Sequence, residues 1–425
     1  MCIMHEAGHY TTITPDGDNL KKKISVCLVD IPIFICIIRL TNVKNSCKGG
    51  ICLRKNYLDN IRWITVVIVV LYHVFYMYNA EGILGGIGQI TNLAVQPYDI
   101  FQYLVYPWFM PILFIVAGIS SRLYLEKHTN KEFIKSRTTK LLVPSTIGLF
   151  VFQFIQGYVN LHLADGAEEL AAAGVPKFVI FLIMVASGSG VLWFVHLLWI
   201  YSIILVVIRN IEKDKLLEIG SRTPLWLTVL FFFPVWGAAQ ILNTPIISVY
   251  RFAFYFVFFM LGYYVFSNEE VMDKLKKYAA AFIIIGAALC IAFAILNFIV
   301  RGGANYADKP VNRGPLYAAC AYFGSLAMLS GMAGFGDFSN DFTKWMSSHS
   351  FGLYVFHYLG ISTVALIFAK NAILPAPLCY LLSLIAGFVF GYGLYALISR
   401  IPFFRWAVLG ISKEKDQKNK EQNNV

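Results

Sequence analysis

Long apolar runs separated by short polar stretches form the dominant pattern of this chain. The runs lie at about 57–79, 104–125, 141–160, 190–208, 225–242, 250–267, 279–300, 314–334, 351–369 and 377–398. Each is close to the roughly 20 residues that a helix needs to cross a bilayer, whereas a membrane β-barrel would show shorter alternating segments. The pattern predicts an all-α fold, a polytopic integral membrane helix bundle of about ten transmembrane helices. A further apolar segment over 177–187 is too short to span.

The composition supports this fold class. Of 425 residues, 58% are hydrophobic and only 14% are charged, and the mean hydropathy is +0.64, so there is too little polar surface to close a soluble globule. The net charge of +11 raises the question of nucleic acid, but the Lys and Arg residues lie between the apolar runs, and we expect no nucleic-acid partner. Three of the eight cysteines lie inside apolar runs and the others follow no CxxC spacing, so we expect no metal site.

The distribution of basic residues predicts an orientation. The connection over 79–103 contains no Lys or Arg, whereas the next, over 126–140, contains five. Later connections continue this alternation, with fewer basic residues after odd-numbered runs than after even-numbered ones. By the positive-inside rule, the core should lie in the cell membrane with its N- and C-termini in the cytoplasm.

Three segments are expected along the chain. Residues 1–52 form a poorly organised extension whose one apolar run, 24–40, is interrupted by Asp30, Pro32 and Arg39. A signal sequence or short anchor is one interpretation, but the run has no clean cleavage site, and we favour a dispensable segment. Residues 53–410 form the membrane domain. Residues 411–425 form a charged cytoplasmic tail that we expect to be disordered.

The first span, YLDNIRWITVVIVVLYHVFYMYN over 57–79, carries ionisable residues that a plain anchor does not need. On an α-helix the eleven steps from Arg62 to His73 come to roughly 1100°, about 20° past three turns, and cover about 16 Å. Both side chains therefore share a face, and Asp59 lies beside them. Because ionisable groups that face lipid cost several kcal/mol, this face should point into the bundle or a water-filled cavity.

The phrase LDNIRWITVVIVVLYHV, with ten residues between Arg62 and His73, resembles the opening helix of the membrane acyltransferase family three, which includes the glucan biosynthesis protein C type. Other phrases are similar in the same order: WFMPILFIVAGISSRLYL, FIKSRTTKLLVPS, GSGVLWFVHLLWIYS and SFGLYVFHYLG. The resemblance covers about residues 53–405. It implies an enzyme that moves an acyl group, acetyl or succinyl, from cytoplasmic acyl-CoA to a hydroxyl of an extracytoplasmic glycan or glycolipid, with no permanently bound cofactor.

The chain also departs from the pattern of that family. The basic pair after the second span is usually Arg-x-x-Arg, but here it reads Arg137-Thr-Thr-Lys140, and an ammonium group cannot supply the planar fork of a guanidinium. We expect no extracytoplasmic esterase-like domain of the kind that some relatives append. We therefore expect all the chemistry to take place in the bundle.

The residues of the first span fit an acyl transfer. A sugar hydroxyl is a poor nucleophile at neutral pH and needs a base, for which histidine is the usual choice. We predict that His73 and Arg62 are catalytic, with His73 as the base or as a transient acyl carrier. Arg62, held by Asp59, would bind the donor's phosphates or its thioester arm. The alternative is that His73 only hydrogen-bonds a neighbouring helix.

Further substrate-binding candidates come from the later runs. Lys135 and Arg137 would bind the nucleotide end of the donor, although both also fit a plain orientation signal. Trp193 and His196 would recognise the acceptor, as would His357 in the ninth run. Each of these three also fits the simpler role of a packed core or interface residue.

Two other classes of function stay open at this point. A secondary transporter or flippase would also place charges inside a bundle, but it should show inverted halves or broken helices near the midplane, and the sequence shows neither. A membrane scaffold would leave Arg62 and His73 without a purpose.

Overall fold

The computed structural model describes residues 55–78, 96–243, 250–303 and 305–411. In these ranges the chain is helical, and the single β contact is an isolated bridge between Asn243 and Arg251. The extension predicted over 1–52 and nearly all of the predicted tail lie outside the described residues. An all-α, multi-pass architecture is therefore confirmed for the part of the chain that the structure describes.

Eight helices in the described ranges are long and apolar enough to cross a membrane. Three of them contain π-helical turns and two begin with a 3₁₀ turn, so several labelled segments make one span. They are α3 (Asn56–Tyr78), η2 with α4 (Pro97–Leu125), α5 to α7 (Asn130–Leu163), η5 with α10 (Gly190–Glu212), α16 with η6 (Ala279–Val300), α18 (Pro315–Phe335), α19 with η7 (Asp341–Ala369) and α20 (Ala376–Ile398).

Two of the ten expected spans have a different form. The run at 225–242 gives α12 (Leu225–Leu230) and α13 (Phe232–Ala238), which bend by 111° from α11 (Lys215–Ser221) and make at most a broken ninth span. The run at 250–267 gives only α14 (Phe252–Tyr264), with 13 residues. Backbone chemistry contributes to the first case, because extended Pro224 precedes α12 and Pro234 in α13 has no N–H for a helical hydrogen bond. The short apolar segment expected at 177–187 is helix α9 (Lys177–Ser187).

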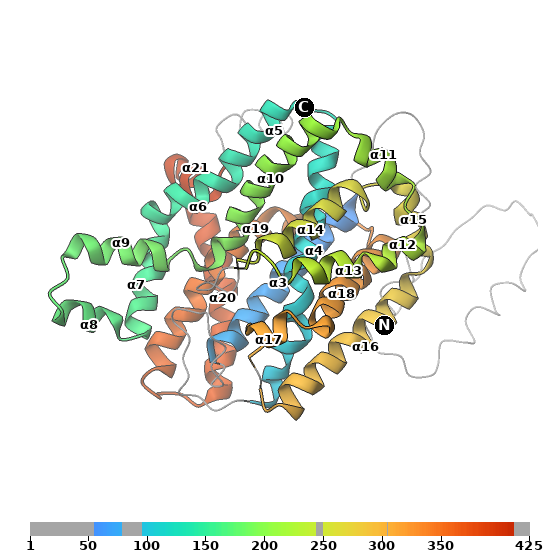
Figure 1. Ribbon diagram of the computed structural model, residues 1–425. Coiled ribbons are helices and arrows are strands. Elements are labelled where there is room, and N and C mark those ends of the chain that lie inside the picture. The colour runs from blue at the N-terminus through green and yellow to red at the C-terminus, as the bar shows by residue number, and fades with distance from the viewer. Residues whose placement is uncertain (1–54, 79–95, 244–249, 304, 412–425) are drawn as a thin grey trace, which may run out of the picture. The chain divides into compact units, whose positions relative to one another are not determined.

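Helix α3 runs through the middle of the bundle, where it packs against α4, α18, α19 and α20 (Figure 1). Its N-terminus is fixed by the loop after α18. The Nδ2 atom of Asn60 donates to the carbonyl oxygens of Gly336 (2.8 Å) and Phe338 (2.9 Å), and the backbone N–H of Tyr57 donates to Asp337 (2.9 Å). These bonds set the position of α3 along its axis, and therefore the depth of its ionisable side chains.

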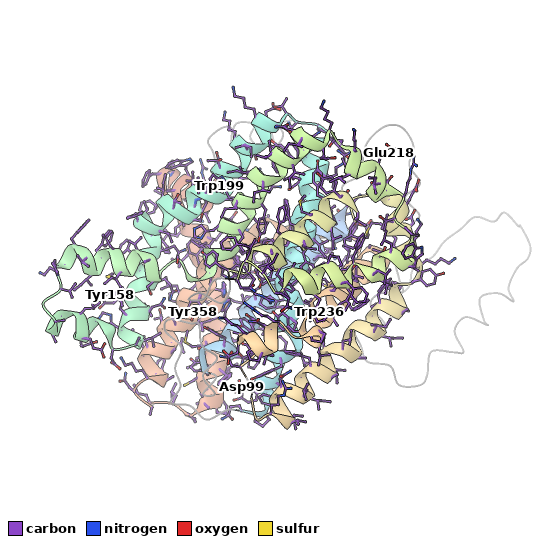
Figure 2. The ribbon with its side chains drawn as sticks, viewed as in Figure 1. Asp99, Tyr158, Trp199, Glu218, Trp236 and Tyr358 are labelled. Carbon is purple, nitrogen blue, oxygen red and sulfur yellow. The ribbon has the colours of Figure 1, made fainter. Side chains whose placement is uncertain are left out.

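The bundle has two chemically different ends. Helices α5 (Asn130–Arg137), α11 and α21 (Pro402–Leu409) lie towards the top of Figure 1, and α8 (Gly166–Ala172) and α17 (Lys309–Asn312) towards the bottom. Figure 2 shows Glu218 near the first end and Asp99 near the second. We call the first the basic end, because it carries Lys131, Lys135 and Lys213.

Candidate functional site

Two histidines from distant parts of the sequence meet inside the bundle. The Nε2 atom of His357, on α19, lies 3.0 Å from the Nδ1 atom of His73, on α3. His357 is fully buried, whereas His73 is partly accessible. The predicted base therefore has a second imidazole as its immediate partner.

Neighbouring carbonyl groups determine which nitrogen atoms carry protons. The Nδ1 atom of each ring lies 2.9 Å from the backbone oxygen four residues earlier, Val69 for His73 and Leu353 for His357. A carbonyl oxygen only accepts, so Nδ1–H is the donor in both rings and Nε2 carries the lone pair. The Nδ1–H of His73 is then shared between Val69 and the Nε2 atom of His357, and the Nε2 atom of His73 can accept a proton.

Aromatic side chains surround this pair. The ring centroids of Tyr72 and Tyr358 lie 5.1 Å from that of His73, and the centroid of Tyr76 lies at 6.1 Å. Figure 2 shows Tyr358 between the two ends of the bundle. Such rings limit the access of water, and they offer flat surfaces on which a sugar can stack.

A hydrogen-bonded chain of polar groups begins beside His73. The hydroxyl of Tyr306 donates to Oε1 of Gln102 (2.8 Å), so the contact of 3.0 Å between the hydroxyls of Tyr72 and Tyr306 has Tyr72 as donor. The Nε2 atom of Gln102 is buried, and none of the described residues accepts a hydrogen bond from it. This series of hydrogen bonds thus ends at the amide group of Gln102, which can donate to an oxygen atom of a ligand.

Arg62 and Arg137 meet nearer the basic end. Arg62 donates to Asp59 (2.5 Å) and to the hydroxyl of Ser120, and Arg137 donates to the hydroxyl of the next residue, Ser121 (3.0 Å). Two guanidinium groups that are hydrogen-bonded to adjacent serines repel one another unless an anion lies between them or close by. The contact expected between Asp59 and Arg62 is present, and one carboxylate leaves this cluster with a net positive charge.

The remaining predicted site residues lie apart from the histidine pair. Lys135 is exposed at the basic end. His196 has both ring nitrogens occupied, with Nε2 donating to the Ser145 carbonyl oxygen (2.7 Å) and Nδ1 accepting from the Tyr250 hydroxyl (3.0 Å). Trp193 packs against Tyr255, with 5.2 Å between ring centroids. In the structure, neither His196 nor Trp193 contacts His73.

Several polar residues near the site were not singled out from the sequence. Ser120 and Ser121 are an ordinary pair in an apolar run, and Tyr306 lies in a connection between helices. Arg251 stands directly before an apolar run, but it is 2% exposed, and its guanidinium lies 4.0 Å from the ring centroid of Phe254. Of these residues, only Arg251 could have been recognised as buried from the sequence. The apolar run that follows it, FAFYFVFF, gives it few polar neighbours there.

The described residues include no group of three His, Cys, Asp or Glu side chains positioned to hold a metal ion.

Comparison with known families agrees with this architecture. The chain matches the acyltransferase family whose model is described as "Acyltransferase domain" over residues 55–396. This match covers most of the chain, so the protein belongs to acyltransferase family three and is a membrane acyltransferase. No curated protein and no solved structure matches it.

Proposed function

We propose that this protein transfers an acyl group, acetyl or succinyl, from cytoplasmic acyl-CoA to a hydroxyl of an extracytoplasmic glycan or glycolipid. The observation that carries the proposal is the pair His73 and His357, in which both Nδ1 atoms are tied to carbonyl oxygens. This arrangement leaves the Nε2 atom of His73 as a base in a partly accessible place within the bundle.

The arginine cluster supports an anionic donor. Arg62 and Arg137, from different helices, hydrogen-bond to the adjacent residues Ser120 and Ser121, and two guanidinium groups suit phosphate oxygens of coenzyme A. Arg62 also shares a helix face with His73, about 16 Å away along the axis. A donor held by its phosphates at the arginines can therefore extend its acyl arm towards the histidine.

The transfer then takes place in two steps, addition of the acceptor hydroxyl to the thioester carbonyl and elimination of the thiolate. The acceptor hydroxyl oxygen bonds to the thioester carbonyl carbon while its proton passes to the Nε2 atom of His73. The carbon–sulfur bond breaks, the thiolate of coenzyme A leaves, and the proton returns from Nε2 to that sulfur. His357 accepts a hydrogen bond from the Nδ1–H of His73 throughout and so stabilises the imidazolium.

A covalent route uses the same geometry. The Nε2 atom of His73 bonds to the thioester carbonyl carbon, the carbon–sulfur bond breaks, and coenzyme A leaves as its thiolate. The acceptor oxygen then bonds to the acyl carbon, the carbon–nitrogen bond breaks, and the hydroxyl proton passes through the freed Nε2 atom to the thiolate. Incubation with labelled acyl-CoA in the absence of acceptor separates the two routes, because only the covalent route leaves label on the protein.

Replacement of His73 tests the proposal. His73→Ala should lower the acylation of surface glycans by at least about 100-fold, because general base catalysis contributes about 10² to 10⁴ in rate. Acyl content is measured in cells that lack the native protein and express each variant at matched membrane abundance. His162→Ala is the control, because that side chain bonds only within its own helix, to the Tyr158 carbonyl oxygen. Near-normal acylation by His73→Ala would remove the basis of the proposal.

A further inference from the structure

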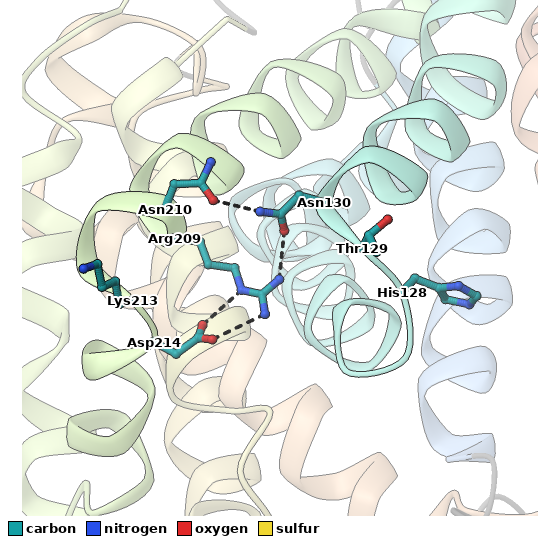
Figure 3. A pocket seen from close by; sticks show the side chains of 7 residues that line it. All are labelled: His128, Thr129, Asn130, Arg209, Asn210, Lys213 and Asp214. Atoms are coloured by element: carbon teal, nitrogen blue, oxygen red, sulfur yellow. Dashed lines mark hydrogen bonds and ion pairs between the residues drawn. The ribbon is translucent and has the colours of Figure 1, made fainter.

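A polar hollow of about 390 Å³ opens at the basic end, away from the histidine pair. It lies between the connection from α4 to α5 and the C-terminus of α10, and Figure 3 shows its lining. Its walls include the cationic side chains of Arg209 and Lys213, the imidazole of His128 and the single carboxylate of Asp214. The lining therefore has a net positive charge.

The guanidinium of Arg209 is held in place and still has donors to offer. It donates through Nε to Asp214 (3.0 Å) and through a terminal nitrogen to Asn130 (2.9 Å), with a further bond to Asp214 at 3.3 Å (Figure 3). Asn130 in turn donates to Asn210 (2.8 Å). A guanidinium has five N–H groups, so two of those on Arg209 have no partner in the part of the chain that the structure describes.

The backbone directly after α10, beside Arg209, adopts an energetically unfavourable conformation. Lys213 and Asp214 have φ angles of 53° and 61°, in the left-handed region that non-glycine residues rarely adopt. Glycine is the usual residue at such a helix end. Here the chain instead keeps a lysine and an aspartate, and both residues line the hollow.

A continuous series of side-chain contacts joins the hollow to the arginine cluster. It passes along aromatic rings from His128 to Arg137 and then across the two serines to Arg62. The contacts are the stacked rings of His128 and Tyr124 (4.2 Å), the rings of Tyr124 and Phe133 (5.9 Å), Arg137 over Phe133 (5.0 Å), Arg137 with Ser121, and Arg62 with Ser120.

We infer that this hollow binds the nucleotide end of the acyl-CoA donor, with Arg209 and Lys213 as the residues that recognise its 3′-phosphate. The inference rests on the proposed function, because it takes coenzyme A as the carrier of the acyl group. The donor then lies along the contact series, with its nucleotide in the hollow and its arm directed past Arg137 and Arg62. This placement leaves the pyrophosphate, where the arm of the donor begins, to Arg137 and Arg62, and it assigns the nucleotide with its 3′-phosphate to residues outside that cluster.

Binding of coenzyme A and 3′-dephospho-coenzyme A to the full chain in phosphatidylcholine nanodiscs tests the inference by calorimetry. Lys213→Gln should raise the Kd for coenzyme A about tenfold, the usual weight of a charge-assisted hydrogen bond, and should shrink the preference for coenzyme A over its dephospho form. Arg209→Lys keeps the charge but loses the fork and should weaken binding similarly. Lys215→Gln is the matched control, because Lys215 carries the same charge two residues away and does not line the hollow.

The outcomes separate this inference from the proposed function. If the wild-type chain binds coenzyme A and both hollow variants bind it equally well, the hollow is not the nucleotide site, while the acyl-CoA donor stands. If the wild-type chain binds no coenzyme A, the donor assignment itself fails, and the inference fails with it. If Lys213→Gln changes only the binding of anionic lipid, measured in a second set of nanodiscs that contain phosphatidylserine, the ligand is a lipid headgroup and the inference is overturned.

Discussion

At the scale of single residues, the contact between two imidazoles determines which atom of His73 is available for chemistry. His357 cannot donate from Nε2 while its Nδ1–H bonds to Leu353, so it accepts from His73 and leaves the opposite nitrogen of His73 basic. A lone histidine held only by Val69 would have the same tautomer but a weaker hold on its ring. His357 is therefore expected to act as a positioning residue and to stabilise the charge that forms on His73.

Substitution of His357 separates this role from simple packing. His357→Leu should lower kcat about tenfold, equal to the loss of one hydrogen bond of ~1.4 kcal/mol, with little change in the KM for the donor. His357→Gln should recover part of the rate, because its side-chain oxygen can accept the Nδ1–H of His73. Steady-state kinetics on the reconstituted protein provide the measurement. Equal rates for the two variants would assign His357 to packing.

The sequence predicted part of this site for a clear physical reason. Arg62 and His73 share a face because the helical period fixes it, and Asp59 contacts Arg62 because three residues bring two side chains together on a helix. The partnership of His73 and His357 was not predictable in this way, since the two are 284 residues apart. Ser120, Ser121 and Tyr306 were missed for the same reason, because their contacts arise only when helices pack.

At the scale of helices, close approach between α4 and α14 depends on glycine. A Cβ atom on Gly118 would overlap the carbonyl oxygen of Phe259, and one on Gly262 would overlap that of Ile115. Small residues are the usual means by which membrane helices approach closely, because lipid gives little hydrophobic drive for their association. This contact positions α4, which carries Ser120 and Ser121 just after Gly118.

A single methyl group should therefore weaken the contact between α4 and α14. Gly118→Ala should destabilise the protein by about 1–3 kcal/mol, the usual cost of overpacking, and lower the Tm measured in detergent. Gly393→Ala is the control, because nothing lies within 4 Å of a Cβ atom there and alanine favours helix by about 1 kcal/mol over glycine. An unchanged Tm for Gly118→Ala would contradict the tight contact.

The sequence predicted most helices but not the form of two. Apolar length is a reliable guide where a run has no break, as in α16, α18 and α20. It fails at α11 to α13 and at α14, because hydropathy counts apolar residues and does not register Pro224, Pro234 or an early helix end. Helix α14 begins directly after Arg251, a buried charge that composition alone would place in a loop.

At the scale of the whole protein, the proposed function requires a particular orientation. In the proposed function the donor is acyl-CoA on the cytoplasmic side, so the basic end, with Arg209, Lys213 and the arginine cluster, should face the cytoplasm. The asymmetry of Lys and Arg between connections favours the same direction independently of any chemistry. Reversed insertion would place the hollow and the arginines on the side that lacks the donor.

Labelling of single cysteines tests this orientation. A membrane-impermeant maleimide should reach Glu168→Cys and Lys309→Cys in intact cells, because both positions are exposed at the end opposite the basic end. Lys131→Cys and Glu218→Cys, exposed at the basic end, should react only after permeabilisation. In the starting variant for this labelling, the cysteines before residue 53 are replaced by serine. Cys290, Cys320 and Cys379 can remain because they are buried. If the basic-end positions react first in intact cells, the donor and the arginine cluster are on opposite sides of the membrane. In that case transfer from cytoplasmic acyl-CoA cannot proceed as proposed, even if His73 proves essential.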